Sequence, residues 1–174
     1  MAISNVNGEV KSSRLILTLA RPQYDEHPDA VAQKIQQVLQ PQTCVALPQS
    51  WQNINTLADA HRWLRTQLLE AQIYMVVHRT TSELLGVAVV HEQGEEAYIG
   101  YVIAKEHWGK GYASEALQTL VACYKEQATV KTLWAGVSKD NISSIKVLTK
   151  SGFELANSEH QDLDTRHYVL SLEN

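Results

Sequence analysis

The residue pattern with the clearest chemical meaning is a pair of glycines, Gly109 and Gly111, at the boundary between two predicted elements. The apolar run 98–104 before them predicts a strand, and the spacing of apolar residues over 113–124 predicts a helix. The first backbone amides of a helix have no partner inside it and point outward, where they can bind an anion. Glycine lacks a Cβ, so an anion can approach the backbone closely. The turn therefore predicts a phosphate-binding site.

Lys110 lies between the two glycines and adds its positive charge to that of the helix N-terminus. A plain turn is the alternative for a glycine pair taken alone. Two common phosphate motifs do not fit, because the three-glycine dinucleotide fingerprint is not met and no Gly-Lys-Ser/Thr follows the spacer of a P-loop. The pattern therefore indicates another phosphate-bearing ligand.

The glycine turn is one of four ordered motifs, Ile-Gly-Tyr-Val-Ile at 99–103, Trp-Gly-Lys-Gly-Tyr-Ala-Ser-Glu-Ala at 108–116, Asp-Asn-Ile-Ser-Ser at 140–144 and Lys-Ser-Gly-Phe at 150–153. The series resembles the GNAT superfamily of acyl-CoA-dependent N-acyltransferases, and within it the RimJ/RimL type, the ribosomal-protein N-terminal acetyltransferases. The match covers 98–153, and the residues at 14–17 fit the opening strand of that branch. The resemblance implies an α/β fold, a single domain with a mixed, mostly antiparallel sheet and helices on both faces.

The resemblance also implies acetyl-CoA as the co-substrate. In the family, the pantetheine amides pair with the backbone of the strand before the turn, which corresponds here to Val102 and Ile103. Asp140 or Asn141 is the predicted N-cap of a later helix. For Asn141 the resemblance adds a hydrogen bond to the CoA arm, and a simple cap is the alternative. The backbone amides expected to hold the diphosphate belong to Trp108, Gly109, Lys110, Gly111, Tyr112 and Ala113.

Residues for proton transfer are less well defined. Many family members protonate the departing thiolate with a Tyr, and that position is Leu148 here. The RimJ/RimL branch offers a Ser three residues after the Asn, which matches Ser144; a serine hydroxyl is a poor acid, so we expect hydrogen bonding to the sulfur before proton donation. An ordinary surface serine is the alternative. Tyr101 and Tyr112 are expected to line the groove or simply to pack.

Glu106 also departs from the family, which often has Gln or Arg there. Its carboxylate would repel a diphosphate, so we expect it to turn away. The general base is undetermined: an N-terminal amine with a pKa near 8 needs little help, and a lysine-like amine near 10.4 needs more. The candidates are Glu96, His91, Glu159, His160 and Asp162, and for each of them a solvated surface group is the favoured alternative.

Composition limits the partners. With 174 residues, a net charge of −4 and a pI near 6.0, the chain fits one domain without a basic field, so nucleic acid is not expected as a partner. Cys44 and Cys123 lack metal-ligand spacing and suit reduced thiols in a cytoplasm, and the seven histidines form no ligand cluster, so no metal is expected. The N-terminal stretch is polar, so neither a signal peptide nor a membrane partner is expected.

The elements that must position these residues follow from periodicity and caps. We expect a loose tail at 1–12 and the acetyltransferase domain at 13–174. The predicted helices are 28–40, 56–71 with Thr56 and Asp59 as a capping box, 112–126 and 141–149, with a loop at 42–55. The predicted strands are 14–20, 73–78, 84–91, 97–104, 130–137, 153–156 and 167–172. Hairpins in the middle and alternating helices and strands later predict a mixed sheet.

Two functions fit the sequence. The first is an acetyl-CoA-dependent N-acetyltransferase that acts on a primary amine, of a protein N-terminus or a small molecule, by direct attack in a ternary complex, since no activated nucleophile is recognisable. The second is a non-catalytic acyl-CoA-binding module, which Glu106 and Leu148 favour. Small-molecule or peptide amines are the expected partners, and a homodimer is compatible with either function.

Overall fold

The computed structural model describes residues 8–157 and 164–173, and these residues form one eight-stranded sheet in the order β1-β2-β3-β4-β5-β6-β8-β7. All neighbouring strands are antiparallel except β5 and β6, which are parallel. The predicted α/β class with a mixed, mostly antiparallel sheet is therefore confirmed. The strands are β1 Glu9–Lys11, β2 Leu15–Leu19, β3 Gln72–His78, β4 Leu84–Gln93, β5 Glu96–Ile103, β6 Thr132–Ser138, β7 Glu154–Leu155 and β8 Thr165–Ser171.

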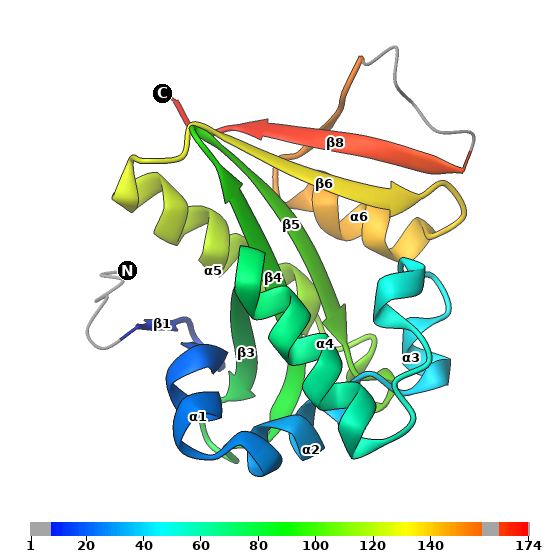
Figure 1. The fold of residues 1–174 in the computed structure, drawn as a ribbon. Helices are drawn as coiled ribbons and strands as arrows, with labels where there is room; N and C mark the ends of the chain where they lie inside the picture. Colours follow the sequence, from blue (N-terminus) through cyan, green and yellow to red (C-terminus); the bar gives the residue numbers. More distant parts are fainter. Residues whose placement is uncertain (1–7, 158–163, 174) are drawn as a thin grey trace.

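Helices cover both faces of the sheet, as predicted (Figure 1). On one face, α5 and α6 pack through buried residues such as Leu117 and Leu148. On the other face, α2 and α4 pack through residues such as Ile35 and Leu64. The helices are α1 Ala20–Glu26, α2 Pro28–Val38, α3 Pro41–Cys44, α4 Leu57–Glu70, α5 Tyr112–Gln127 and α6 Ile142–Lys150, with short 3₁₀ turns η1 Gln49–Trp51 and η2 Lys105–His107.

Two predicted helix starts are confirmed by their hydrogen bonds. The Thr56 hydroxyl accepts a hydrogen bond from the Asp59 amide at 3.1 Å, and the Asp59 carboxylate accepts one from the Thr56 amide at 2.9 Å, which is a complete capping box. At α6, Asn141 Oδ1 accepts a hydrogen bond from the Ser144 amide at 3.1 Å. Local side-chain chemistry therefore sets where both helices begin.

Two predictions about local structure are wrong, and one helix was missed. Residues 9–11 are not a loose tail but strand β1, which pairs with β2. The segment 42–55 is not a plain loop, because it contains the end of α3 and all of η1. Helix α1, which starts directly after β2 without a side-chain cap, was not predicted at all. These elements are three to seven residues long, which is too short to show a clear hydrophobic period in the sequence.

The two parallel strands separate soon after they meet. β5 and β6 pair only at Glu96↔Thr132, Ala97↔Leu133 and Tyr98↔Trp134, although β5 continues to Ile103 and β6 to Ser138. Figure 1 shows them diverging towards their C-terminal ends. β6 stays paired with β8 over its whole length, so the sheet has a gap on the β5 side of β6. We call this stretch, in which the two strands are no longer paired, the β5–β6 gap.

No helix within the described ranges is both long and apolar enough to cross a membrane. The division into a tail at 1–12 and a domain at 13–174 stays a prediction, although pairing of β1 with β2 joins at least residues 9–11 to the sheet.

Candidate functional site

The glycine turn leads from η2 into α5. Gly109 has a φ of +74° and Gly111, the N-cap of α5, a φ of +80°, both in the left-handed region that favours glycine. A Cβ added to Gly109 would meet no heavy atom within 4 Å, so the backbone there borders open space. The sequence prediction of glycines with positive φ at the start of a helix is therefore confirmed.

The backbone amides of this turn are free to bind a ligand. Within 8–157 and 164–173, no residue accepts a hydrogen bond from the amides of residues 109–114, and the Glu115 amide donates to the Gly111 carbonyl at 3.1 Å. The amide of Trp108 is engaged, because it closes η2 by donating to the Lys105 carbonyl at 3.1 Å. We therefore define the amide cradle as residues 109–114 and leave the Trp108 amide out of it. Free amides and the positive end of α5 together favour an anion.

Three side chains near the cradle, those of Lys110, Glu106 and Tyr112, are expected from the sequence to be part of the site or of its surroundings. Lys110 Nζ donates to the Glu106 carbonyl at 3.2 Å and remains exposed. Glu106 is exposed and lines a groove together with Lys34 and Glu83. Tyr112 packs against the core, and its ring centroid lies 6.0 Å from that of His78. Of the two roles expected for Tyr112, packing is therefore the one that its contacts support.

The C-terminal end of β5, which borders the β5–β6 gap, lies shortly before the cradle in the chain. Val102 packs on the α2/α4 face and Ile103 on the α5/α6 face, and both side chains are buried. The Ala104 amide donates to the Leu85 carbonyl of β4, so in the alternation of this antiparallel pair the Val102 backbone faces β4 and the Ile103 backbone faces the gap. Of the two, only Ile103 therefore turns backbone groups towards the gap. The Ile103 carbonyl already accepts a 2.7 Å hydrogen bond from the indole Nε1 of Trp108. That side chain is half exposed and lies against the C-terminal end of β5.

Ser144 faces β5 from the first turn of α6. Its hydroxyl oxygen lies 2.8 Å from the hydroxyl oxygen of Tyr101, and both residues are half-buried. Burial raises the pKa of Tyr101 to about 12, against the lowering effect of its hydrogen bond with Ser144. Tyr101 is therefore a neutral hydroxyl at physiological pH. The contact joins β5 to α6 on the face that carries the cradle helix, and sequence reasoning missed it.

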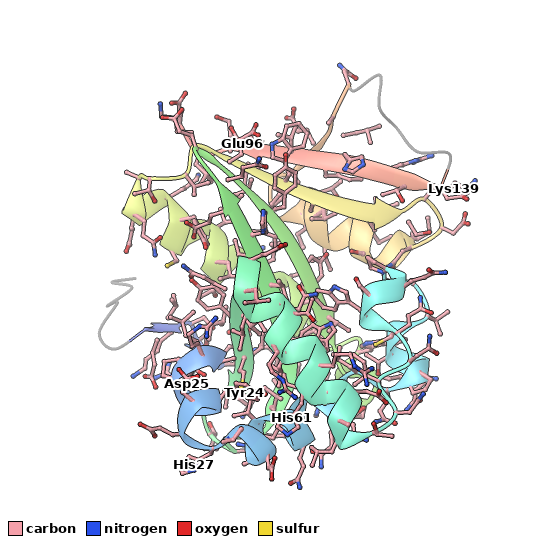
Figure 2. The ribbon with its side chains drawn as sticks, in the orientation of Figure 1. Tyr24, Asp25, His27, His61, Glu96 and Lys139 are labelled. Atoms are coloured by element: carbon pink, nitrogen blue, oxygen red, sulfur yellow. The ribbon has the colours of Figure 1, made fainter. Side chains whose placement is uncertain are left out.

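Glu96 is not brought together with these residues. It is the first residue of β5, at the paired end of the strand, and its exposed carboxylate accepts a 3.2 Å hydrogen bond from Trp134 Nε1 (Figure 2). At about 3.3 Å per residue, seven residues of strand separate Glu96 from Ile103 by about 23 Å. His91 is half-buried and pairs with Tyr98, next to the start of the gap. Glu159, His160 and Asp162 lie outside the described residues.

The residue that replaces the family's Tyr, Leu148, is fully buried in the core beneath α6. It offers no polar group to the gap, so among the described residues Ser144 and Tyr101 are the hydroxyls that the structure places together there. Groups of three or more potential metal ligands are absent from the described part of the chain.

A family model described as an acetyltransferase (GNAT) domain matches residues 14–154, and the chain belongs to this family. The uncharacterized N-acetyltransferase p20 of Bacillus licheniformis is 31% identical over 88 residues, and YoaA of Bacillus subtilis, also an uncharacterized N-acetyltransferase, is 34% identical over 82 residues. These matches cover 49% and 45% of this chain and 49% and 46% of the relatives, so the chain matches about half the length of each.

Solved structures extend the likeness over nearly the whole chain. A GNAT-family acetyltransferase from Bacillus anthracis aligns with a TM-score of 0.76 and 18% identity, covering 95% of this chain and 99% of that one. RimL, a ribosomal L7/L12 α-N-protein acetyltransferase in complex with coenzyme A, aligns with a TM-score of 0.70 and 20% identity, covering 92% of this chain and 95% of RimL. The microcin C7 self-immunity acetyltransferase MccE, in complex with acetyl-CoA and AMP, aligns with a TM-score of 0.73 and 17% identity, covering 98% of this chain and 99% of MccE. These likenesses show the fold.

Proposed function

We propose that the protein is an acetyl-CoA-dependent N-acetyltransferase that transfers the acetyl group to a primary amine by direct attack in a ternary complex. The observation that carries the proposal is the amide cradle, residues 109–114, which opens at the N-terminus of α5 next to the β5–β6 gap. A diphosphate is a dianion with several acceptor oxygens, which is the ligand that such an array of donors favours. Membership of the GNAT family and the CoA named in the RimL structure support the same ligand.

The gap gives the rest of the cofactor a path. We assign the diphosphate to the cradle and the pantetheine arm to the gap. Because the Val102 backbone faces β4 and the Ile103 carbonyl is engaged by Trp108, the Ile103 amide is the group we assign to pairing with this arm. Asn141 lies at the start of α6 and caps it through Oδ1, so its side-chain amide nitrogen is the group we assign to the CoA arm.

Ser144 is the residue we assign to the sulfur. In the transfer, the amine nitrogen forms a bond to the thioester carbon, the carbon–sulfur bond breaks, and the proton lost by the nitrogen ends on the sulfur. A thiol near pKa 8.5 is a stronger acid than either hydroxyl, so Ser144 solvates the sulfur or relays the proton and supplies no net acid. A hydrogen bond from Tyr101 to Ser144 Oγ would leave the Ser144 proton free to point at the sulfur.

The acceptor is a primary amine in this proposal. On the α2/α4 side of the sheet, Tyr98 stacks on Trp134 with ring centroids 6.4 Å apart at the last paired position of β5 and β6. Next to them the buried Trp51 lies against Gly100. Aromatic surfaces attract ammonium groups and also stack on planar ones, so this face suits either a peptide N-terminus or a small amine. An N-terminal amine with a pKa near 8 is partly neutral at pH 7.5 and needs no strong base.

The test is thiol release. The full chain is mixed with acetyl-CoA and a panel of short peptides with free N-termini, lysine-containing peptides with blocked N-termini and small primary amines, and free CoA is followed with a thiol reagent. We expect amine-dependent release with one class of acceptor and acetylated product by mass spectrometry. Tight CoA binding by calorimetry without release for any amine would support the binding module instead, and absence of CoA binding would remove both functions.

A further inference from the structure

Arg14 reaches the amide cradle from a distant part of the chain. It directly precedes β2, yet its Nη1 donates to the Lys110 carbonyl at 3.0 Å and its Nε donates to Glu115 Oε2 at 2.7 Å. The guanidinium also lies over the Tyr112 ring, 4.6 Å from the ring centroid. One side chain therefore holds both the glycine turn and the first turn of α5.

The contact with Lys110 sets the direction of a cradle amide. In a trans peptide the carbonyl of one residue and the amide of the next point in opposite directions. Because Arg14 holds the Lys110 carbonyl on its own side, the Gly111 amide points to the other side, away from Arg14. A Cβ on Gly111 would approach Arg14 Nη2 to 3.4 Å, which shows how closely the guanidinium lies against the turn.

The contact with Glu115 cancels a charge that would oppose the ligand. Glu115 Oε1 accepts hydrogen bonds from the Arg14 amide and the Ser12 hydroxyl, both at 2.7 Å. Burial acts to raise the pKa of Glu115, but these hydrogen bonds and the Arg14 charge hold the pKa below its usual value. The carboxylate is thus ionised at neutral pH in the first turn of the helix whose N-terminus would bind a diphosphate. Without Arg14, this charge would repel the dianion.

We infer that Arg14 is a positioning residue for the diphosphate of CoA: it turns the Gly111 amide outward and neutralises Glu115. The inference rests on the proposed acetyl-CoA function of the cradle. Arg14 acts through the turn and through Glu115, and no direct contact with the ligand is needed.

The first experiment compares Arg14→Ala with Arg79→Ala by calorimetry with CoA. Arg79 is a matched control, because its Nη1 donates to the carbonyls of Ser12 and Ser13 at 2.7 and 3.3 Å and so anchors the same segment without touching the cradle. We expect Arg14→Ala to raise the Kd for CoA about tenfold, the scale of a charge effect at a helix N-terminus, and Arg79→Ala to change it by less than about twofold. Equal losses in the two variants would overturn the inference.

The second experiment separates charge from anchoring. In the double variant Arg14→Ala, Glu115→Gln, removal of the uncompensated carboxylate should recover part of the lost affinity, whereas a purely structural Arg14 predicts no recovery. Arg14→Lys keeps the charge but cannot reach both acceptors, so its Kd should lie between those of the wild type and Arg14→Ala, and it serves if Arg14→Ala fails to fold. Wild-type affinity in Arg14→Lys and no recovery in the double variant would overturn the inference. A wild-type chain that does not bind CoA would instead overturn the proposed function.

Discussion

Two regions of the molecule look chemically active for opposite reasons. The amide cradle, residues 109–114, offers its ligand unpaired backbone amides and has no hydrogen-bonded set of acidic and basic side chains among the described residues. A second region, between α1, α2 and α4, joins three such side chains: the Tyr24 hydroxyl lies 2.8 Å from His61 Nδ1, and His61 Nε2 lies 2.8 Å from Asp29 Oδ1 (Figure 2 labels Tyr24 and His61). By residue type, the second region resembles a proton relay.

The hydrogen bonds around the two regions indicate that the cradle, and not the Tyr24–His61–Asp29 chain, is the binding site. Each group of the Tyr24–His61–Asp29 chain is a partner of another, and the chain ties three helices together on the α2/α4 face. The cradle amides have no partner among the described residues and lie beside a gap in the sheet. Hydrogen-bonding groups that the fold leaves free and exposed indicate a binding site better than reactive residue types that satisfy one another.

The largest expected effect comes from Gly111→Val. A β-branched residue at a φ of +80° is strained, and its side chain would stand beside the cradle amides. We expect the Kd for CoA to rise about 30-fold or more by calorimetry, the scale of losing charge-assisted hydrogen bonds. Gly94→Val is the matched control, because Gly94 has a φ of +63° with open space around it in the β4–β5 turn. Equal losses of affinity in both variants would show that strain alone, and not the cradle, is responsible.

A smaller effect is expected at the gap, where Ser144→Ala removes the hydroxyl that we assign to the sulfur. We expect kcat to fall about tenfold with little change in the KM for acetyl-CoA, because one hydrogen bond made in the transition state is lost. Tyr101→Phe should lower kcat by less, since Ser144 keeps its hydroxyl but loses its partner. Steady-state kinetics with the acceptor found in the amine panel would measure both, and an unchanged kcat in Ser144→Ala would make Ser144 an ordinary helix residue.

His61→Ala tests the other region. It should destabilise the protein by about 1 kcal/mol for each hydrogen bond lost, measured by urea unfolding, and leave the Kd for CoA unchanged. A marked loss of turnover in a folded His61→Ala protein would mean that the Tyr24–His61–Asp29 chain takes part in catalysis, and the contrast between the two regions would fail.

The smallest effect is a pH dependence at Glu115. Its pKa is lowered in the folded protein, so the stabilisation from its ionised form is complete above the unfolded-state pKa of about 4.3 and is lost as the pH falls through the folded-state pKa. The difference in unfolding free energy between the wild type and Glu115→Gln should be about 1 kcal/mol at pH 7 and shrink at pH 3.5. Urea unfolding at the two pH values measures it, and a difference that grows towards acid would contradict the assigned contacts.

The sequence predicted the features that depend on neighbours in the chain. Glycines before a helical pattern indicated the cradle, and Asn141 and the Thr56–Asp59 pair indicated helix starts, because capping is a local interaction. Contacts across the fold were not predictable from one sequence. Arg14 and Glu115 are 101 residues apart, and Tyr101 and Ser144 are 43 apart, so their meeting depends on strand order and register. The engagement of the Trp108 amide depends on the η2 turn, which has no clear sequence signal.

The short pairing of β5 with β6 has a mechanical consequence. Only three residue pairs join the β1–β5 part of the sheet to the β6–β8 part along this seam. An extended cofactor arm lying between the strands would take the place of the missing strand contacts and bridge the two parts. Occupancy would then stiffen the seam itself, so amide hydrogen exchange in β5 beyond Tyr98 and in the facing half of β6 should slow when the cofactor is bound.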